Sequence, residues 1–135
     1  MAHYFEFCED QVAYVRDTAT KSCYQIISLL ESNEEFLNPF MEKVLAFKQA
    51  KKFSMRQAFI MMCESVVRGD PEDQSAAKNK DAERLFKKYF LKSFVELQSD
   101  RIVNVRLQLS ETLALLYEKN ERLERMPEEE KESGK

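Results

Sequence analysis

The side chains best suited to acid–base, nucleophilic or metal chemistry are few in this chain and widely spaced. The one histidine is His3, so neither a histidine-based catalytic triad nor a metal site has a second imidazole. The three cysteines do not follow the paired spacing of a zinc site. Asp70, Glu72 and Asp73 cluster, but without the alternating order and the glycine of a calcium loop. These patterns predict a chain that is not an enzyme and that holds no metal or cofactor.

The composition indicates one all-α domain. The chain has 135 residues, of which 44% are hydrophobic and 33% charged, with only two glycines and three prolines. The net charge of −3 argues against nucleic acid as a partner, because phosphate binding requires clustered positive charge. No apolar run approaches the roughly 18 residues of a membrane span. An odd number of cysteines without a signal peptide favours buried thiols and a location in the cytoplasm or the nucleus.

A second kind of pattern joins an acidic residue to an arginine six positions later. It occurs as Asp10 with Arg16 and again as Asp100 with Arg106. A weaker copy is centred on Arg56, where Ala50 takes the acidic position. Arg16 and Arg56 are 40 residues apart, and Arg56 and Arg106 are 50 apart, which approximates the period of about 40–47 residues of two-helix repeats.

Hydrophobic periodicity divides the chain into about five amphipathic helices. The predicted helices span about 10–31, 34–49, 53–68, 81–98 and 102–123. The polar segment 69–80 follows the strong helix stop Gly69-Asp70-Pro71 and is predicted to be a mobile loop. Residues 1–123 then form a single segment of stacked repeats, and the charged tail 124–135 is expected to be disordered.

The repeated charges have a physical role if these helices pair in antiparallel fashion. The acidic residue falls in the short turn within each pair, where it can cap the exposed N–H groups of the second helix. The arginine can lie across that turn and bind the acidic residue of its own or of the next repeat. Because one pair cannot bury both of its faces, the pairs stack, and the charges form a ladder. The ladder residues are Asp10, Arg16, Arg56, Asp100 and Arg106.

The pattern of an aspartate followed by a Val-Arg dipeptide resembles the HEAT repeat. The segment 89–100, YFLKSFVELQSD, followed by VNVRL at 103–107, is similar to repeats in the scaffold subunit of type-2A protein phosphatases. It is equally similar to the HEAT-type regulatory subunits of protein phosphatase 4. The resemblance covers roughly residues 10–120 and implies an α-solenoid of antiparallel helix pairs.

The resemblance also implies a non-catalytic regulatory or scaffold module. Such proteins hold a phosphatase catalytic subunit, and other regulatory subunits, on the ridge formed by the turns inside each repeat. In this chain the turns are expected at 7–9, 50–53 and 99–101, which makes Lys51, Lys52 and Arg101 the candidate partner-binding residues. Each of the three also fits an ordinary solvated turn residue.

Two other interpretations remain open at the level of sequence. One is a HEAT-type adaptor in transport, chromatin or translation, and the other is a compact five-helix bundle. The first repeat lacks most of its first helix, and neither end carries the polar capping unit that repeat arrays need. We therefore expect the sequence to be a piece, or a shortened form, of a longer array.

Overall fold

The regular structure of this chain is all helical. The computed structural model describes the backbone of residues 3–125 and the side chains of residues 3–122. Over that range it contains eight α-helices, one 3₁₀ helix and no strand. In chain order the elements are α1 (Tyr4–Cys8), α2 (Ala13–Thr20), α3 (Cys23–Leu30), α4 (Glu34–Lys48), α5 (Phe53–Arg68), α6 (Ala76–Tyr89), α7 (Leu91–Glu96), η1 (Leu97–Ser99) and α8 (Val103–Arg125).

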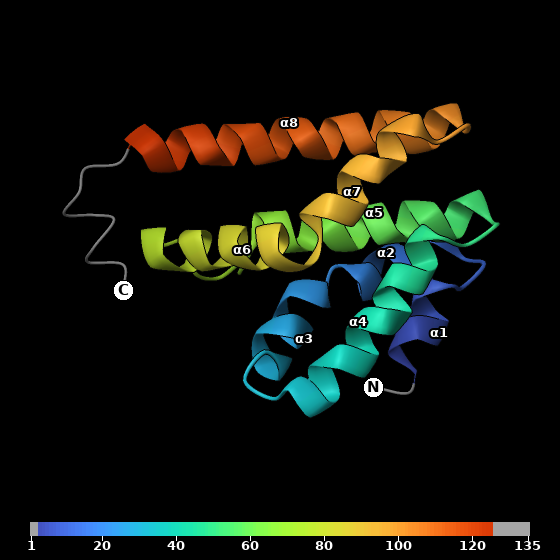
Figure 1. Ribbon diagram of the computed structural model, residues 1–135, viewed down its shortest axis with the longest axis horizontal. Coiled ribbons are helices and arrows are strands. Elements are labelled where there is room, and N and C mark those ends of the chain that lie inside the picture. Colours follow the sequence, from blue (N-terminus) through green and yellow to red (C-terminus); the bar gives the residue numbers. More distant parts are fainter. Residues whose placement is uncertain (1–2, 126–135) are drawn as a thin grey trace.

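The described helices form three antiparallel pairs that stack in a row. The first repeat pairs α1 with α2 and α3, the second pairs α4 with α5, and the third pairs α6, α7 and η1 with α8. Helix α5 contacts α2 and α3 of the repeat before it and α6 and α8 of the repeat after it. Figure 1 shows α8 running alongside α5, with the first repeat on the other side of α5. The fold is the α-solenoid that the sequence predicts.

The number of helices differs from the expected five. The predicted helix 10–31 is two helices, α2 and α3, and the additional short helix α1 precedes them. The predicted helix 81–98 is likewise divided into α6, α7 and η1. By contrast, α4, α5 and α8 begin within one residue of the predicted positions. Asn33 caps α4 as an N-cap should, because its side chain accepts a hydrogen bond from the Glu35 amide at 3.1 Å.

A side chain of the second repeat binds the backbone at the point where α2 and α3 are divided. The Ser65 hydroxyl on α5 donates to the Lys21 carbonyl at 2.8 Å and accepts from the Tyr24 amide at 3.1 Å. These are backbone groups at the junction, where the helical ladder is interrupted. A buried interruption survives only if another group satisfies the freed donor and acceptor. The periodicity of α2 and α3 could not show this, because the group that satisfies them lies 41 to 44 residues away.

The division between α6 and α7 accompanies a cluster of phenylalanine rings. The α6 helix ends at Tyr89, and Phe90 stands between it and α7 with a φ of −120°. The ring of Phe86 stacks on Phe90 with centroids 6.3 Å apart and meets Phe94 edge to face at 5.5 Å. All three rings are buried, so the bend turns consecutive parts of the first helix of the third repeat toward one core.

The loop predicted over 69–80 is shorter than expected. Helix α6 begins at Ala76, five residues before the predicted start, because the Ser75 side chain accepts from the Lys78 amide as an N-cap. Gly69 ends α5 with a φ of +74°, and a Cβ there would lie 3.1 Å from the Cβ of Ala82. Of the predicted disordered tail 124–135, residues 124 and 125 belong to α8, and 126–135 lie outside the described residues.

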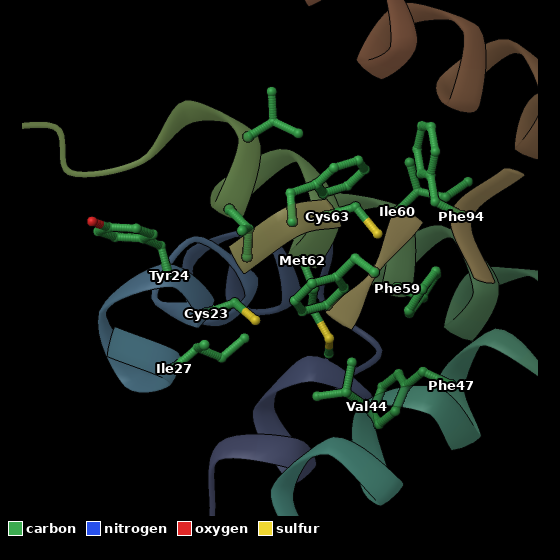
Figure 2. Close-up of a cluster of buried hydrophobic side chains, with 14 of the residues drawn as sticks. Cys23, Tyr24, Ile27, Val44, Phe47, Phe59, Ile60, Met62, Cys63 and Phe94 are labelled. Atoms are coloured by element: carbon green, nitrogen blue, oxygen red, sulfur yellow. The ribbon is translucent and has the colours of Figure 1, made fainter. Parts of the chain in front are cut away.

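One core runs through the three repeats. Its largest fully buried side chains include Phe59, Ile60 and Met62 of α5. Figure 2 shows these side chains together with others from α3, α4 and α7, which come from all three repeats. The middle helix is therefore buried on both flanks, whereas the outer helices each keep one face open to solvent.

We predict that Ser65→Ala lowers the free energy of unfolding by about 1–3 kcal/mol, because it leaves a partly buried carbonyl and a buried amide at the α2–α3 junction unpaired. The measurement is equilibrium urea denaturation. The matched control is Ser110→Ala, since the Ser110 hydroxyl is exposed and bonds only the Arg106 carbonyl of its own helix. A shift of about 0.5 kcal/mol or less is expected for the control, and equal shifts in both variants would contradict the role given to Ser65.

Candidate protein-interaction site

The turns within the three repeats lie along one edge of the molecule. They connect α1 to α2, α4 to α5, and η1 to α8, and Figure 1 shows all three at the same end of the helices. We call this edge the turn ridge and define it as residues 9–12, 49–52 and 100–102. The turn within the first repeat thus begins at Glu9, slightly later than the expected 7–9, because α1 continues to Cys8.

An arginine closes each turn of the ridge in the same way. In all three copies an arginine Nη1 group donates to a main-chain carbonyl of the turn that lies six residues before it. The bonds run from Arg16 to Asp10 and Gln11 at 2.7 and 3.0 Å, from Arg56 to Ala50 and Lys51 at 2.9 Å each, and from Arg106 to Asp100 at 2.6 Å. The three repeats therefore have equivalent turns, although the middle copy lacks the acidic residue.

The aspartates of the ridge make a second recurring contact. The Asp10 carboxylate accepts from the Val12 amide at 2.8 Å, and the Asp100 carboxylate accepts from the Ile102 amide at 2.9 Å. Both bonds span two residues and fix the chain as it enters the second helix of the repeat. Ala50 has no side-chain acceptor, so this contact is missing from the middle turn.

Arg56 also joins the second repeat to the third. Its Nε and Nη2 atoms donate to Oδ2 and Oδ1 of Asp100 at 2.6 and 3.1 Å, in the bidentate geometry that favours Arg–carboxylate pairs. The two side chains are only 10% and 6% exposed. The hydrogen bonds from Arg56 lower the pKa of Asp100; burial opposes this shift, and the Ile102 amide adds to it. Arg56 of the second repeat thus neutralises the charge of Asp100 in the turn of the third repeat.

The other ladder residues do not form such a pair within the described part of the chain. Arg16 points its guanidinium at its own turn, and Ala50 stands where the next repeat would present a carboxylate. Asp10 and Arg106 also bond only to the main chain of their own turns. The structure brings together Arg56 and Asp100, and among the described side chains the remaining three charges, Asp10, Arg16 and Arg106, have no ionic partner.

Lys51, Lys52 and Arg101 project from two adjacent turns of the ridge. All three are exposed. The Lys51 carbonyl is bound by Arg56, and Arg101 directly follows Asp100, so the Arg56–Asp100 pair fixes the backbone from which these side chains extend. Three positively charged side chains therefore extend from the turns that flank the Arg56–Asp100 pair, whose own charges cancel.

Other contacts between repeats were not predicted from the sequence. Lys48 of α4 pairs with Glu96 of α7, and Arg84 of α6 binds Glu31 at 2.6 and 2.8 Å. These pairs lower the pKa of Glu96 and of Glu31 respectively. They join residues 48 and 53 positions apart, a separation at which no local periodicity indicates a contact.

The cysteines are inert structural residues. Cys8, Cys23 and Cys63 are free thiols with no exposed surface. Burial raises the pKa of all three thiols, to about 11 for Cys8, so they remain protonated at neutral pH. Among the described residues no group of three or more metal-binding side chains is close enough to hold an ion. No helix in the same part of the chain is long and apolar enough to cross a membrane.

Three known proteins resemble this chain over most of its length. Serine/threonine-protein phosphatase 4 regulatory subunit 1 of Rattus norvegicus is 29% identical over 114 residues. The chain is similar to a phosphatase regulatory subunit. The human and mouse proteins of that name are each 28% identical over 114 residues.

Each of the three alignments covers 78% of this chain and 10% of the relative, so the chain spans about a tenth of the length of the relatives it matches. No protein-family model and no solved structure matches the chain. The relatives are regulatory rather than catalytic subunits, which agrees with the prediction that this chain is not an enzyme.

We predict that Asp100→Asn lowers the free energy of unfolding by about 2–4 kcal/mol at neutral pH, because it leaves the Arg56 guanidinium without its counter-charge in a poorly solvated site. Asparagine can still accept from the Ile102 amide, so the turn itself is kept. Asp10→Asn is the matched control, since it preserves the equivalent turn bond and removes no ion pair within the described residues. Its expected change is within about 0.5 kcal/mol, and equal destabilisation of both variants would contradict the assignment.

The same pair predicts a pH dependence. Because the folded-state pKa of Asp100 is lowered, the pair stabilises the protein fully above the ordinary aspartate pKa of about 3.9. This contribution is lost as the pH falls through the lowered folded-state pKa. Wild type should therefore lose stability on acidification more steeply than Asp100→Asn, and the two should converge at low pH. Urea denaturation over a pH series measures the difference, and parallel curves would contradict it.

Proposed function

We propose that this chain is a non-catalytic regulatory or scaffold module of a serine/threonine protein phosphatase of the 2A/4 type, and that it binds its partner through the turn ridge. The observation that carries the proposal is the similarity to a phosphatase 4 regulatory subunit over 78% of the chain. The solenoid fold supports it, because stacked helix pairs present extended surfaces for other proteins.

The chemistry of the ridge supports a protein partner with an acidic or carbonyl-rich surface. Lys51, Lys52 and Arg101 supply three exposed cations from two neighbouring turns. The Arg56–Asp100 pair holds those turns in fixed register, so the cations are positioned before binding and less ordering entropy opposes association. Their exposure indicates that they act at the rim of an interface, where charge governs association rate and orientation.

The proposed partners are the phosphatase catalytic subunit and, alongside it, further regulatory subunits. The proposed location is the cytoplasm, or the nucleus, where such complexes would meet a chain with reduced cysteines. The chain spans about a tenth of the length of its relatives. Its proposed role is therefore to supply one contact surface, and other parts of such an assembly would select the substrates.

We predict that the purified chain binds recombinant catalytic subunit of phosphatase 4, or of phosphatase 2A, at micromolar concentration. The double variant Lys51→Glu/Lys52→Glu should bind about tenfold more weakly, mainly through a slower association rate, because it reverses two charges of the ridge. Biolayer interferometry with immobilised catalytic subunit measures both quantities. Arg101→Glu should weaken binding in the same direction.

The matched control is Lys21→Glu/Lys78→Glu. It makes the same change in net charge at two exposed lysines, one at the α2–α3 junction and one in the first turn of α6, both outside the turn ridge. Binding should be unchanged in this variant. Equal weakening by the two double variants would show that only net charge matters, and absence of association by wild type with either catalytic subunit would overturn the proposal.

A further inference from the structure

The outer side of the first repeat carries an apolar groove. The groove lies between α1 and α2, has a volume of about 400 Å³, and its lining includes Phe7, Tyr14, Val15 and Ala19. Phe7 is 51% and Tyr14 78% exposed, which is costly for large rings in a folded protein. A surface of this shape and polarity fits the side of another helix.

Residues that line the groove have equivalents in the third repeat. Val15 and Ala19 hold the same repeat positions as Val105 and Leu109 of α8. In the third repeat these two positions are buried, at 0% and 5% exposure, where α8 packs against α5 of the preceding repeat. The groove is therefore the surface on which a preceding repeat would pack.

The outer face of α8, at the opposite side of the row of repeats, carries exposed apolar side chains. Leu113 is 47% exposed, although the equivalent residues Cys23 and Cys63 are completely buried. Tyr117 is 67% exposed, although its equivalent Val67 is 4% exposed. The first and second repeats are each followed by another repeat, and no further repeat packs on the third among the described residues. The apolar face of α8 thus has the surface on which a following repeat would pack.

Two ladder residues, Asp10 beside the groove and Arg106 of α8, have no ionic partner among the described residues. Within the described residues, Asp10 has no arginine from a preceding repeat, and Arg106 has no aspartate from a following one. Both side chains are held by their own turns in the arrangement seen at Asp100 and Arg56. Arg106 of one copy and Asp10 of another could therefore form the same kind of pair as Arg56 and Asp100, which joins the second repeat to the third.

We propose that copies of this chain stack head to tail, with the outer face of α8 of one copy in the α1–α2 groove of the next and Arg106 bound to Asp10 as Arg56 is bound to Asp100. A second copy is the occupant because both halves of the interface, apolar and ionic, belong to this one chain and are complementary to each other. The contact is heterologous, so each added copy presents the same two surfaces again. The assembly grows with concentration into short strings and does not stop at a symmetric dimer.

Sedimentation velocity over a concentration series tests the proposal with charge-reversed variants. Wild type should form dimers and larger species at high micromolar concentration. Asp10→Arg alone sets two arginines against each other at every contact, and Arg106→Asp alone sets two aspartates against each other. Each variant should therefore associate at least about tenfold more weakly than wild type. An equimolar mixture of the two variants restores an opposite charge wherever the two kinds of copy alternate, and it should associate like wild type.

The mixture separates a lost interface from a damaged fold, because an unfolded variant cannot be rescued by another. Glu42→Arg is the control, since it reverses an exposed charge on α4 away from both surfaces and should leave association unchanged. Leu113→Lys, on the outer face of α8, should abolish association when it is added to both variants of the mixture as well as alone.

Three results would overturn the proposal. The first is a wild type that stays monomeric at every concentration. The second is a mixture that is no more associated than the single variants. The third is a loss of association with Arg106→Asp but not with Asp10→Arg, which would mark a symmetric contact between α8 helices.

Discussion

A pair of antiparallel helices can bury one broad face by itself and exposes the other, so it is stable only beside further pairs. This constraint explains the position of α5. It is the second helix of the middle pair and contacts helices of both neighbouring pairs. Its side chains Phe59, Ile60 and Met62 are fully buried as a result, and the core of the protein is built around them. Both outer pairs therefore pack against α5.

Arg56 solves a second problem, which is how to keep the second and third pairs in register. Apolar contact alone permits neighbouring helices to slide, whereas a bidentate guanidinium–carboxylate pair fixes distance and direction together. Arg56 does both jobs, because one nitrogen closes its own turn and the other two bind the turn of the next repeat.

Much of this architecture could be predicted from the sequence because its causes are local. The apolar spacing of α4, α5 and α8, the Asn33 cap and the Gly69 stop each act within one helix or turn, so the bounds of these helices follow from neighbouring residues. The recurrence of Arg16, Arg56 and Arg106 likewise records a turn geometry that the structure repeats three times.

The features that were missed have causes elsewhere in the chain. The junction between α2 and α3 depends on the Ser65 hydroxyl, and the ion pairs Lys48–Glu96 and Arg84–Glu31 join distant helices. The bend after α6 accompanies packing of Phe86, Phe90 and Phe94. The pattern within a single helix carries none of this information. The choice of Lys51, Lys52 and Arg101 rests on the resemblance and on exposure, and it stays a prediction until a partner is tested.

The presence of alanine at position 50 has a mechanical consequence. Among the described residues, the contacts between the first and second repeats include the Phe5 ring against Phe40 and Phe47 and the hydrogen bonds of Ser65. Between the second and third repeats they include one buried and one more exposed ion pair. Dissolved salt screens exposed charges and leaves apolar contacts intact or strengthens them. A rise in ionic strength therefore weakens the exposed Lys48–Glu96 pair between the second and third repeats, while the buried Arg56–Asp100 pair and the ring contact of Phe59 with Phe90 keep these repeats together.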